Sequence, residues 1–556
     1  MEDGGLEREV KLDAGFGFRI PELDGLAAAV TARPQPEQHL HAVYVDTPDL
    51  RLARNGLTLR HRSERLPSSA PGEWTFKLPE PSTEPGLSRR ELNWPGRFGP
   101  IPAEVSGLLR GYRRTAALGP VARLVTHRRR TILAGRDGEP LLEIDDDVVS
   151  VMDARRLAAR FREVEVEVLG GASAALLDAV LARLGEAGAV RGDARPKLVR
   201  ALGLRATEPP DVVPVVVGRA ASMGEAVRAA IAQGYLRLLA HDLGVRLDED
   251  PEDVHLARVA TRRLRSDLRT FRAFLPEDWA QETRRELGWL AEALGRARDA
   301  DVLLARLHRE VESLDSRDAA AAGALIGALI ASRDQARDHL LEVMVSDRYG
   351  ELLDRLVAAA RELPPMKQPA DPVLADPVLT STALAITASA AAAVIPVEAP
   401  MSAGEPHLVV EEPAADRDAP ARRLAPSVVN GPWRHVARAV AALDPEPTDE
   451  ALHEVRIRAK RLRYACEAVA GVIGKPATDL ARAAADLQGV LGDFHDAIVA
   501  AEWLRAGAAS PTATPAEALA AGQVIVRERQ EAARCRAAWP ASWKRLDRKK
   551  LRAWLH

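Results

Sequence analysis

Polar and apolar residues alternate along short segments in the N-terminal part of the chain. The segments "REVKL", "LTLRHR", "WTFKL" and "FREVEVEVL" place polar residues on every second position, and successive side chains of a strand point to opposite faces. Turn residues such as Asn55-Gly56 and Asp137-Gly138 separate several of these segments. The pattern predicts a mostly antiparallel β-domain over residues 1–205, followed by a linker at 206–217.

From residue 218 onward, the apolar positions recur three and four residues apart, which is the spacing of an amphipathic helix. One break interrupts this pattern at residues 364–432, which contain 12 of the 38 prolines of the chain. Such a composition is typical of a disordered or loosely ordered insert. The helical region 218–556 is therefore predicted to comprise a first half at 218–363, the insert, and a second half at 433–556.

The helical region contains an internal repeat. Residues 255–265, "HLARVATRRLR", align without gaps with residues 453–463, "HEVRIRAKRLR". Downstream, "LGRARDADV" from Leu294 matches "LGDFHDAIV" from Leu491. Two such blocks in the same order indicate a duplicated helical unit, with the insert between the two copies.

Bulk composition limits the class of protein. The net charge is only −3, so any affinity for polyanions must come from local clusters of charge. Two cysteines, Cys466 and Cys535, argue against a disulfide framework and suit a reducing cytosol. The N-terminus lacks an apolar signal segment, and the apolar run from Ala383 is shorter than the roughly 20 residues of a membrane span. A cytoplasmic protein without a membrane partner is expected.

Charge gathers on one face of several predicted strands. Glu7, Glu9 and Lys11 share a face, and the same holds for Arg60 with Arg62. The solvated face of an antiparallel sheet would explain any single strand of this kind. The three glutamates of "EVEVE" would repel each other, however, unless positive groups lay between them. Acidic and basic strands in one sheet favour a closed barrel whose polar interior binds phosphates and a divalent cation.

The Glu7-x-Glu9-x-Lys11 string resembles the ExExK motif of the CYTH domain. That superfamily of triphosphate tunnel enzymes includes inorganic triphosphatases, thiamine triphosphatases and class IV adenylyl cyclases. The segments "YVDTPDLRLARNGLTLRHR", "WTFKLP", "SRRELNW", "EVEVEV" and "KLVRAL" follow in the order that the family shows. The resemblance covers about residues 1–205. It implies an eight-stranded antiparallel barrel that encloses a charged tunnel and hydrolyses a triphosphate with Mg²⁺ or Mn²⁺.

The resemblance also implies roles for individual residues. The catalytic set is Glu7, Glu9 and Lys11. The triphosphate would be bound by Arg60, Arg62, Lys77, Arg128, Arg130 and Lys197. The metal would be held, directly or through water, by Glu7, Glu9, Glu163 and Glu165. Further candidates for the tunnel are Glu91, Glu143, Asp145 and Glu167. A metal-bound water would attack the terminal phosphoryl group, and the cationic lining would stabilise the leaving diphosphate.

Two positions depart from the pattern of the CYTH family. Members often have a further acidic residue two positions after the equivalent of Glu91, and this chain has Asn93 there. The serine that often precedes the late lysine is absent from "ARPKLVR". Both departures affect the number of metal ions and the contacts with the substrate near that end of the tunnel.

The repeated helices carry a basic stripe beside an apolar one. In the first copy the stripe has spacings of three and four and consists of His255, Arg258, Arg262, Arg265, Arg269 and Arg272. The second copy has His453, Arg456, Lys460 and Arg463. A solvated helix face would explain one such stripe. Because acidic residues are nearly absent at the balancing positions and the stripe occurs twice, the pattern predicts a cationic surface for a repeating polyanion.

This region resembles the CHAD domain, a conserved-histidine α-helical domain that is often fused to CYTH. The match covers roughly residues 215–556 and includes "VHLARVATRRLR" and "LHEVRIRAKRLRY". The resemblance implies two four-helix bundles with pseudo-twofold symmetry that bind inorganic polyphosphate and can localise to polyphosphate granules. The candidates for polyphosphate binding are His255, Arg258, Arg262, Arg265, His453, Arg456, Lys460 and Arg463, with Arg269 added on spacing alone. The insert is longer than the usual connection between the bundles.

An α+β multidomain protein is thus predicted, with a β-barrel triphosphatase followed by an all-α polyphosphate-binding domain. Tripolyphosphate is the favoured substrate. The alternatives are a polyphosphate-binding protein without catalysis and an adenylyl cyclase. Nucleic-acid binding is disfavoured, because aromatic residues make up only 4% of the chain. A metal site at His255 or His453 is also disfavoured, because neither has a second ligand three or four residues later. No oligomeric state is predicted.

Overall fold

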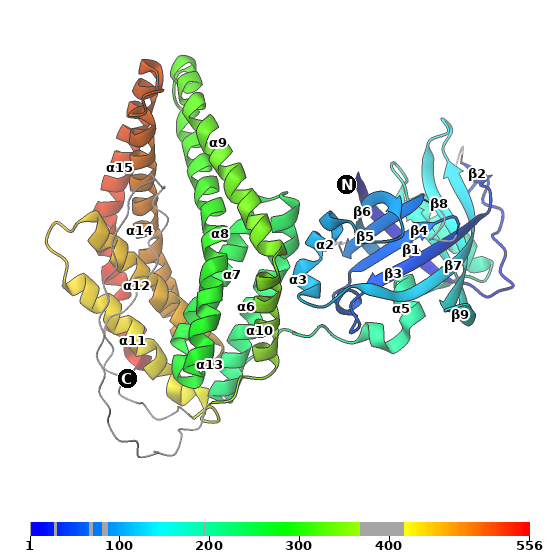
Figure 1. Ribbon diagram of the computed structural model, residues 1–556, viewed down its shortest axis with the longest axis horizontal. Helices are drawn as coiled ribbons and strands as arrows, with labels where there is room; N and C mark the ends of the chain where they lie inside the picture. The colour runs from blue at the N-terminus through cyan, green and yellow to red at the C-terminus, as the bar shows by residue number, and fades with distance from the viewer. Residues whose placement is uncertain are drawn as a thin grey trace, which may run out of the picture. The chain divides into compact units, whose positions relative to one another are not determined.

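The computed structural model forms two compact units, Met1–Asp211 and Val212–His556 (Figure 1). The ranges that it describes are 2–26, 30–65, 71–79, 87–192, 195–366 and 416–555, with the backbone alone for residues 2–7, 87 and 88. The first unit is built on an antiparallel sheet and the second is helical. This arrangement confirms the predicted fold class.

Eight antiparallel strands make up most of the first unit. They are β1 (Glu2–Asp13), β3 (Gln38–Asp46), β4 (Thr58–Ser63), β5 (Pro71–Pro79), β6 (Leu87–Arg97), β7 (Gly119–Ala134), β8 (Pro140–Asp153) and β9 (Arg156–Val168). Their order in the sheet is β1-β6-β5-β4-β3-β7-β8-β9, and β9 also pairs with β1, so the order returns to its first strand. Two short strands, β2 (Thr31–Pro34) and β10 (Val190–Arg191), pair with β7 and β1.

Alternation along the strands separates an apolar outer face from a polar inner face. On β9, Val164 and Val166 are fully buried in a cluster that also contains Val180 and Leu184 of α4 (Ala174–Glu186). Their neighbour Glu165 points to the other side of the sheet and lines a cavity. Burial of the apolar set therefore fixes which residues face inward. The other helical segments of this unit are α1 (Arg51–Arg54), α2 (Ala103–Leu108), α3 (Arg110–Arg113), α5 (Lys197–Leu202) and η1 (Gly203–Thr207).

The second unit contains two similar sets of helices. The first set is α6 (Met223–Leu247), α7 (Pro251–Thr270), η2 (Arg272–Phe274), α8 (Glu277–Val311), α9 (Ser316–Val345) and α10 (Asp347–Arg361). The second set is α11 (Ala421–Ala441), α12 (Asp449–Ala468), α13 (Ala470–Ile473), α14 (Lys475–Ala508), α15 (Pro515–Leu546), α16 (Lys549–Arg552) and η3 (Ala553–Leu555). The repeated sequences lie at equivalent places in α7 and α12, which are both 20 residues long and capped by Asp250 and Thr448.

One apolar cluster joins the two halves of the helical unit. It contains Leu303 and Leu307 of α8, Leu329 of α9, Leu504 of α14 and Val524 of α15. Figure 1 shows these four helices as two long hairpins, α8–α9 and α14–α15. Because both hairpins contribute to the same cluster, neither half buries its apolar surface alone.

The insert predicted for residues 364–432 is too long at its C-terminal end. Helix α11 begins at Ala421 and continues through Pro426 and Pro432. Proline lacks an N–H group and usually ends a helix, which is why the sequence favoured a break there. Here Ala425, Val429 and other residues four apart along α11 are buried, so packing overrides the local preference. Residues 367–415 of the predicted insert lie outside the described part of the chain.

A small polar cavity of about 70 Å³ lies among residues of α6, α7, α12 and α13. Asp267 of α7 lines it and is 3% exposed. Burial raises the pKa of Asp267 to about 7, although Arg263 and Arg237 lower it. The folded protein therefore retains a proton that an unfolded aspartate has already released. Stability consequently falls as the pH rises toward 7, and the loss is complete above this value.

Asp267→Asn is expected to remove this pH dependence, because an amide does not ionise. The variant should unfold at a higher temperature than the wild type at about pH 8 and at a similar temperature at about pH 5. Thermal unfolding of the full chain at both pH values measures the difference. Equal melting temperatures of the two proteins at the higher pH would contradict the assignment.

Candidate functional site

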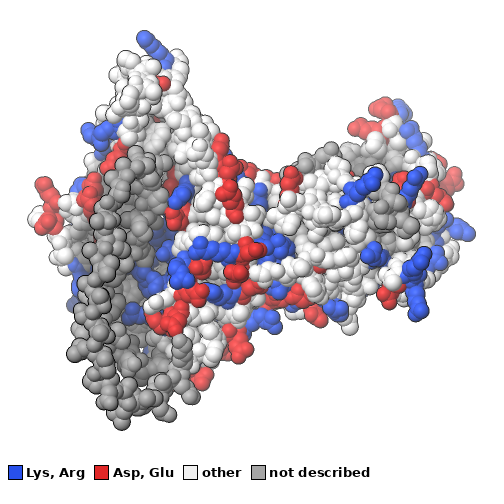
Figure 2. Space-filling view, in the orientation of Figure 1, with Lys and Arg blue, Asp and Glu red and all other residues white. Residues whose placement is uncertain are grey.

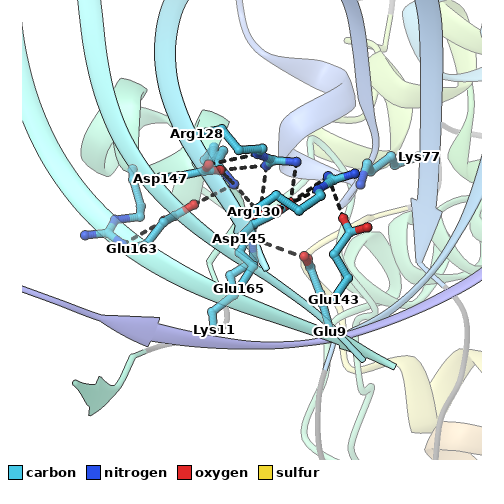
Figure 3. Close-up of polar contacts among 12 residues, drawn as sticks. Glu9, Lys11, Lys77, Arg128, Arg130, Glu143, Asp145, Asp147, Glu163 and Glu165 are labelled. Carbon is cyan, nitrogen blue, oxygen red and sulfur yellow. Dashed lines mark hydrogen bonds and ion pairs between the residues drawn. The ribbon is translucent and has the colours of Figure 1, made fainter. Parts of the chain in front are cut away.

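The sheet of the first unit encloses a cavity of about 250 Å³ lined mainly by charged side chains (Figure 3). All six cations predicted to bind the substrate line it, namely Arg60, Arg62, Lys77, Arg128, Arg130 and Lys197. Of the remaining predicted residues, the cavity is lined by Glu9, Lys11, Glu91, Glu143, Asp145, Glu165 and Glu167. The side chain of Glu7 lies outside the described part of the chain; its backbone belongs to β1.

Strand register explains why these residues meet. Glu9 of β1 is opposite Glu167 of β9, which is opposite Glu143 of β8. One step along the strands, Lys11 is opposite Glu165, and Glu165 is opposite Asp145. Directly opposed residues of an antiparallel pair have their side chains close together on the same face. The cavity therefore has a row of carboxylates beside a row in which cations and anions are mixed.

Lys197 of α5 is the centre of an ion-pair network at one end of the cavity. Its Nζ lies 3.1 Å from Asp147 and 2.9 Å from Glu163, and it also pairs with Glu165. Glu165 in turn pairs with Lys11. Burial lowers the pKa of Lys197, but Glu163, Glu165 and Asp147 together raise it well above its ordinary value. Lys197 therefore stays positively charged although it is buried.

Two arginines of β7 form paired hydrogen bonds with aspartates of β8. The guanidinium group of Arg128 donates to both carboxylate oxygens of Asp147 at 2.8 and 2.6 Å. Arg130 donates to Asp145 at 2.8 and 2.9 Å and lies 2.5 Å from Glu143. Such bidentate pairs hold the planar guanidinium group in one orientation. They place the positive charge of both arginines at the cavity wall.

The wall formed by β4 carries positive charge that the surrounding acids balance less completely. The charge of Arg60, then burial, then Arg128 lower the pKa of Arg62 to about 10, against Glu91 and Glu73, which raise it. A lowered pKa means that the charged form of Arg62 is disfavoured where it lies. An anion in the cavity would remove this penalty, so this wall is suited to bind one.

Carboxylates for a divalent cation are available on the opposite wall. Burial, followed by Asp145, raises the pKa of Glu143 to about 7, which indicates crowded negative charge that a cation would relieve. Glu9, Glu143 and Glu167 supply the hard oxygen donors that Mg²⁺ and Mn²⁺ prefer. Among the described residues, no group of three or more acidic, histidine or cysteine side chains is already gathered closely enough to hold a metal ion.

Glu163 and Glu165 are placed less favourably for a metal than the sequence suggested. Glu163 is fully buried, does not line the cavity, and pairs with Arg200 at 2.8 Å as well as with Lys197. Burial raises the pKa of Glu165, but Lys11, Lys197 and Arg128 lower it well below its ordinary value. The positive partners already neutralise both carboxylates. Metal binding by Glu163 and Glu165 stays a prediction.

In the helical unit, the basic stripe of α7 lies beside helix α8. Arg258 is 7% exposed and lies 3.0 Å from Asp299 of α8. A Cβ atom at Gly295 would come within 2.7 Å of Nη1 of Arg258, so the glycine leaves room for the guanidinium group. Gly492 of α14 occupies the equivalent place in the second half, where a Cβ atom would lie 3.8 Å from Nε of Arg456. The glycine of the repeated "LG" motif thus allows an arginine to lie across the neighbouring helix.

The histidine at the start of each stripe faces a different residue. Burial, then the charge of Arg298, lowers the pKa of His255. In the second half, His453 contacts His495, with their Nδ1 atoms 3.2 Å apart and their ring centres 4.3 Å apart. His495 occupies the position in the repeat that Arg298 occupies in the first half. The two histidines therefore have equivalent positions in the repeat, but their neighbours differ in charge.

Arginines crowd together at the C-terminal end of the first stripe. Burial, followed by Arg461 of α12, lowers the pKa of Arg269 to about 9, and Arg284, Arg265 and Arg272 contribute in the same direction. Figure 2 shows basic and acidic side chains next to each other on one face of this unit. Ion pairs form on the unit as well, and Arg348 lies 2.5 Å from Glu286. The neighbouring charges that act on Arg269 are thus all positive and repel it.

Three other predicted cations, Arg262, Arg265 and Lys460, are partly exposed on α7 and α12. Arg463 lies 2.8 Å from Glu467 of its own helix, so part of its charge is balanced. The structure thus places the predicted polyphosphate-binding residues on two helices that contact each other. Their role in binding stays a prediction.

Comparison with known proteins agrees with both parts of this description. Residues 6–195 match the CYTH domain family, and residues 229–505 match the CHAD domain family. The uncharacterized protein Rv2226 of Mycobacterium tuberculosis (strain ATCC 25618 / H37Rv) is 30% identical over 567 residues, covering 98% of this chain and 96% of its own. The chain belongs to the CYTH–CHAD fusion family.

Two solved structures resemble part of this chain at lower identity. PptA from Streptomyces chartreusis is 23% identical, covers 58% of this chain and 100% of its own, and has a TM-score of 0.42. The CHAD domain from the plant Ricinus communis is 22% identical, covers 60% of this chain and 95% of its own, and has a TM-score of 0.43.

Membership of this family sets the general chemistry. CYTH domains are triphosphatases or cyclases and generally depend on Mg²⁺ or Mn²⁺, so the CYTH domain belongs to a class of phosphoryl-transfer enzymes. CYTH and CHAD domains are in general associated with the binding of triphosphate and polyphosphate. None of the helices in the described ranges is long and apolar enough to cross a membrane.

Sequence reasoning missed three polar residues that line the cavity of the CYTH domain. Arg89 is 6% exposed and lies two residues before Glu91 on β6, so the alternation of the strand could have identified it. Tyr44 and Thr58 also line the cavity. Tyr44 lies opposite Arg60 in the pairing of β3 with β4. This pairing could not be predicted, because the local sequence around a residue does not indicate which strand lies next to it.

Proposed function

We propose that the CYTH domain hydrolyses inorganic tripolyphosphate in the presence of Mg²⁺ or Mn²⁺, and that the CHAD domain binds inorganic polyphosphate. The observation that carries the first part is the division of the cavity into two kinds of wall. Arg60 and Arg62 crowd positive charge on one wall, and Glu9, Glu143 and Glu167 form a carboxylate row on another. A polyanion bound together with a divalent cation would meet its charge complement on both.

Each group of residues has a distinct task in this proposal. The cations Arg60, Arg62, Lys77, Arg128 and Arg130 bind the oxygens of the triphosphate. Glu9, Glu143 and Glu167 would hold the metal ion, which when bound supplies Lewis-acid stabilisation and a nucleophilic water. Lys11, which pairs with Glu165 and lies 3.3 Å from Glu9, keeps the carboxylate of Glu9 oriented toward the cavity.

The positive lining also favours the chemical step itself. Negative charge grows on the leaving diphosphate as the bond to the terminal phosphoryl group breaks. Arg128 and Arg130 are already fixed by their aspartate partners, so they do not reorganise when that charge appears. Fixed donors of this kind stabilise a transition state more than mobile ones do.

The CHAD part of the proposal rests on the crowded arginines of α7 and α12. Arg269 and Arg461 come from different halves of the domain and repel each other. A chain of phosphates can contact both stripes at once, and a planar guanidinium group suits phosphate oxygens. Binding of this kind would concentrate the enzyme at polyphosphate granules in the cytoplasm.

A full-length enzyme assay tests the catalytic proposal. We expect phosphate release from tripolyphosphate with Mg²⁺, slower release from ATP or thiamine triphosphate, and no cyclic AMP from ATP. Lys77→Ala, which removes a cation from the cavity wall, should lower kcat/KM for tripolyphosphate at least about tenfold. Cyclic AMP formation would assign the domain to the cyclases. Absence of phosphate release between mildly acidic and alkaline pH would leave a binding protein.

A competition experiment tests the partner of the CHAD domain. Long-chain polyphosphate bound to the full-length protein should resist displacement by duplex DNA at equal phosphate concentration. Few aromatic side chains accompany the arginines, and these would be needed to stack on bases. Displacement by DNA would assign the surface to nucleic acid instead.

A further inference from the structure

Two polar groups that face each other on the inner side of the CYTH sheet are buried, and neither has a hydrogen-bond partner among the described residues. Thr75 of β5 is 1% exposed and lies directly opposite Asn93 of β6. Within the part of the chain that the structure describes, neither Oγ1 of Thr75 nor Oδ1 of Asn93 has a partner. Buried polar groups of folded proteins are nearly always satisfied. A group that does not belong to the protein is therefore expected between these two side chains.

Their position connects them to the cavity of the CYTH domain. Thr75 is opposite Arg60 of β4, and Arg60 is opposite Tyr44 of β3. Arg60 and Tyr44 both line the cavity. The four residues Tyr44, Arg60, Thr75 and Asn93 thus form one row across four neighbouring strands, on the face that carries the substrate-binding cations.

The chemistry of this row differs from that of the rest of the cavity. It contains two hydroxyl groups, a carboxamide and a guanidinium group, and it has no carboxylate among its four members. The next row along the same strands contains Glu91, which pairs with Lys77. Among these four side chains, a divalent cation would find one guanidinium charge and no negative ligand. The next residue opposite Asn93 is Glu2 of β1, whose side chain lies outside the described part of the chain. The oxygens of a phosphoryl group, in contrast, would find donors in all four side chains.

We propose that Thr75 and Asn93, beside Arg60, bind a phosphoryl group of the substrate by direct hydrogen bonds, without a bridging metal ion. The inference rests on the proposed triphosphatase function and specifies how one part of the substrate is held. Thr75 donates its hydroxyl proton to a phosphoryl oxygen. The carboxamide of Asn93 presents Nδ2 to the same group after a half-turn of its terminal torsion, a rotation that the shape of the amide allows.

The identity of residue 93 determines whether a metal ion is needed to bind the phosphoryl group on this wall. An aspartate at position 93 would repel the phosphoryl group unless a cation lay between them. Asn93 removes that repulsion, so the substrate contact on this wall is independent of Mg²⁺. The metal is then needed only at the opposite wall, where Glu9, Glu143 and Glu167 lie.

Two isosteric substitutions in the full-length protein test this subsite. Thr75→Val is expected to weaken tripolyphosphate binding about tenfold, because one hydrogen bond to a charged group is lost. The effect should appear in KM, with kcat within about twofold, and Thr75→Ser should restore most of the affinity. Asn93→Asp should bind about tenfold more weakly at low Mg²⁺ and should recover as Mg²⁺ is raised. Titration calorimetry gives the Kd, and phosphate release gives KM and kcat.

Thr131→Val serves as the matched control. Thr131 of β7 is also buried, but it follows Arg130 and so lies on the outer face of the sheet. Its Kd and KM should equal those of the wild type. If Thr75→Val and Asn93→Asp also match the wild type, the two side chains hold only a water molecule and the subsite is refuted, while the hydrolase assignment stands.

The binding measurement separates this inference from the proposed function. A wild type that binds tripolyphosphate without hydrolysing it would refute the triphosphatase proposal, and the Kd values of the variants would still decide the role of Thr75 and Asn93. A wild type that neither binds nor hydrolyses tripolyphosphate would overturn both.

Discussion

Arg269→Glu is expected to stabilise the CHAD domain and at the same time to weaken its binding of polyphosphate at least about tenfold. Four other arginines surround Arg269, namely Arg461, Arg284, Arg265 and Arg272. Burial and the positive charges of these arginines lower the pKa of Arg269 to about 9. Reversal of its charge replaces repulsion with attraction. It also removes a donor from the surface where the phosphates would bind.

The duplicated structure supplies the comparison for this variant. A shift of 198 positions relates the two copies, so Glu467 is the equivalent of Arg269, and Arg461 is the equivalent of Arg263. Arg263 and Glu467 form an ion pair of 2.8 Å across the contact between α7 and α12. At the related place, Arg461 meets Arg269 instead. Arg269→Glu would therefore rebuild at the second place the ion pair that exists at the first.

A substitution that raises stability but weakens polyphosphate binding identifies a binding residue, because loss of a structural residue would lower stability. We expect the melting temperature of the ligand-free protein to rise by about 1–2 °C, which corresponds to ~1 kcal/mol for a domain as long as Val212–His556. Arg263→Gln breaks the existing ion pair, so it should lower the melting temperature and leave polyphosphate affinity unchanged. Calorimetric unfolding and a polyphosphate titration measure both quantities. Arg269→Glu with undiminished affinity would remove this cluster from the binding surface.

The sequence predicted which side chains of the CYTH domain face inward, but not which of them meet. Alternation placed Glu163 and Glu165 on one face of β9, and that is where they lie. It could not show that Lys197, far away in the sequence, would pair with both. Register between strands and the docking of α5 arise from packing of the apolar outer face. The metal role predicted from the motif therefore took no account of the cations that pair with these acids.

The helical half illustrates the same limit in another way. Spacing predicted the basic stripes, and their residues lie along α7 and α12. It did not show that one crossing of the two helices is balanced by Glu467 while the related crossing joins Arg461 with Arg269. That difference depends on which residues of α7 and α12 are brought together where the two helices pack. Similarly, the prolines of α11 prevented the prediction of its first turns. The burial of Val429 and its neighbours, which stabilises these turns, cannot be predicted from the local sequence.

Arg62→Gln is expected to have the largest effect on the CYTH domain. The charge of Arg60 and burial lower the pKa of Arg62 to about 10, so its positive charge is held in place at a cost to folding. For a base with a lowered pKa, this cost is present at neutral pH and fades as the pH rises past about 10. A bound phosphate relieves the cost, and therefore the arginine contributes more to binding than an isolated surface arginine would.

The substitution should lower kcat/KM for tripolyphosphate at least about a hundredfold, because a charged, bidentate donor becomes a single neutral one. The melting temperature should stay the same or rise, since repulsion between Arg62, Arg60 and Arg128 disappears. Arg129→Gln is the matched control. Arg129 is the neighbour of Arg128 on β7, pairs with Asp146 at 2.8 Å and does not line the cavity. Asp146 keeps Arg162 as a partner in that variant, so hydrolysis should be unaffected. A loss of activity shared equally by both variants would mean that Arg62 acts only through the stability of the sheet.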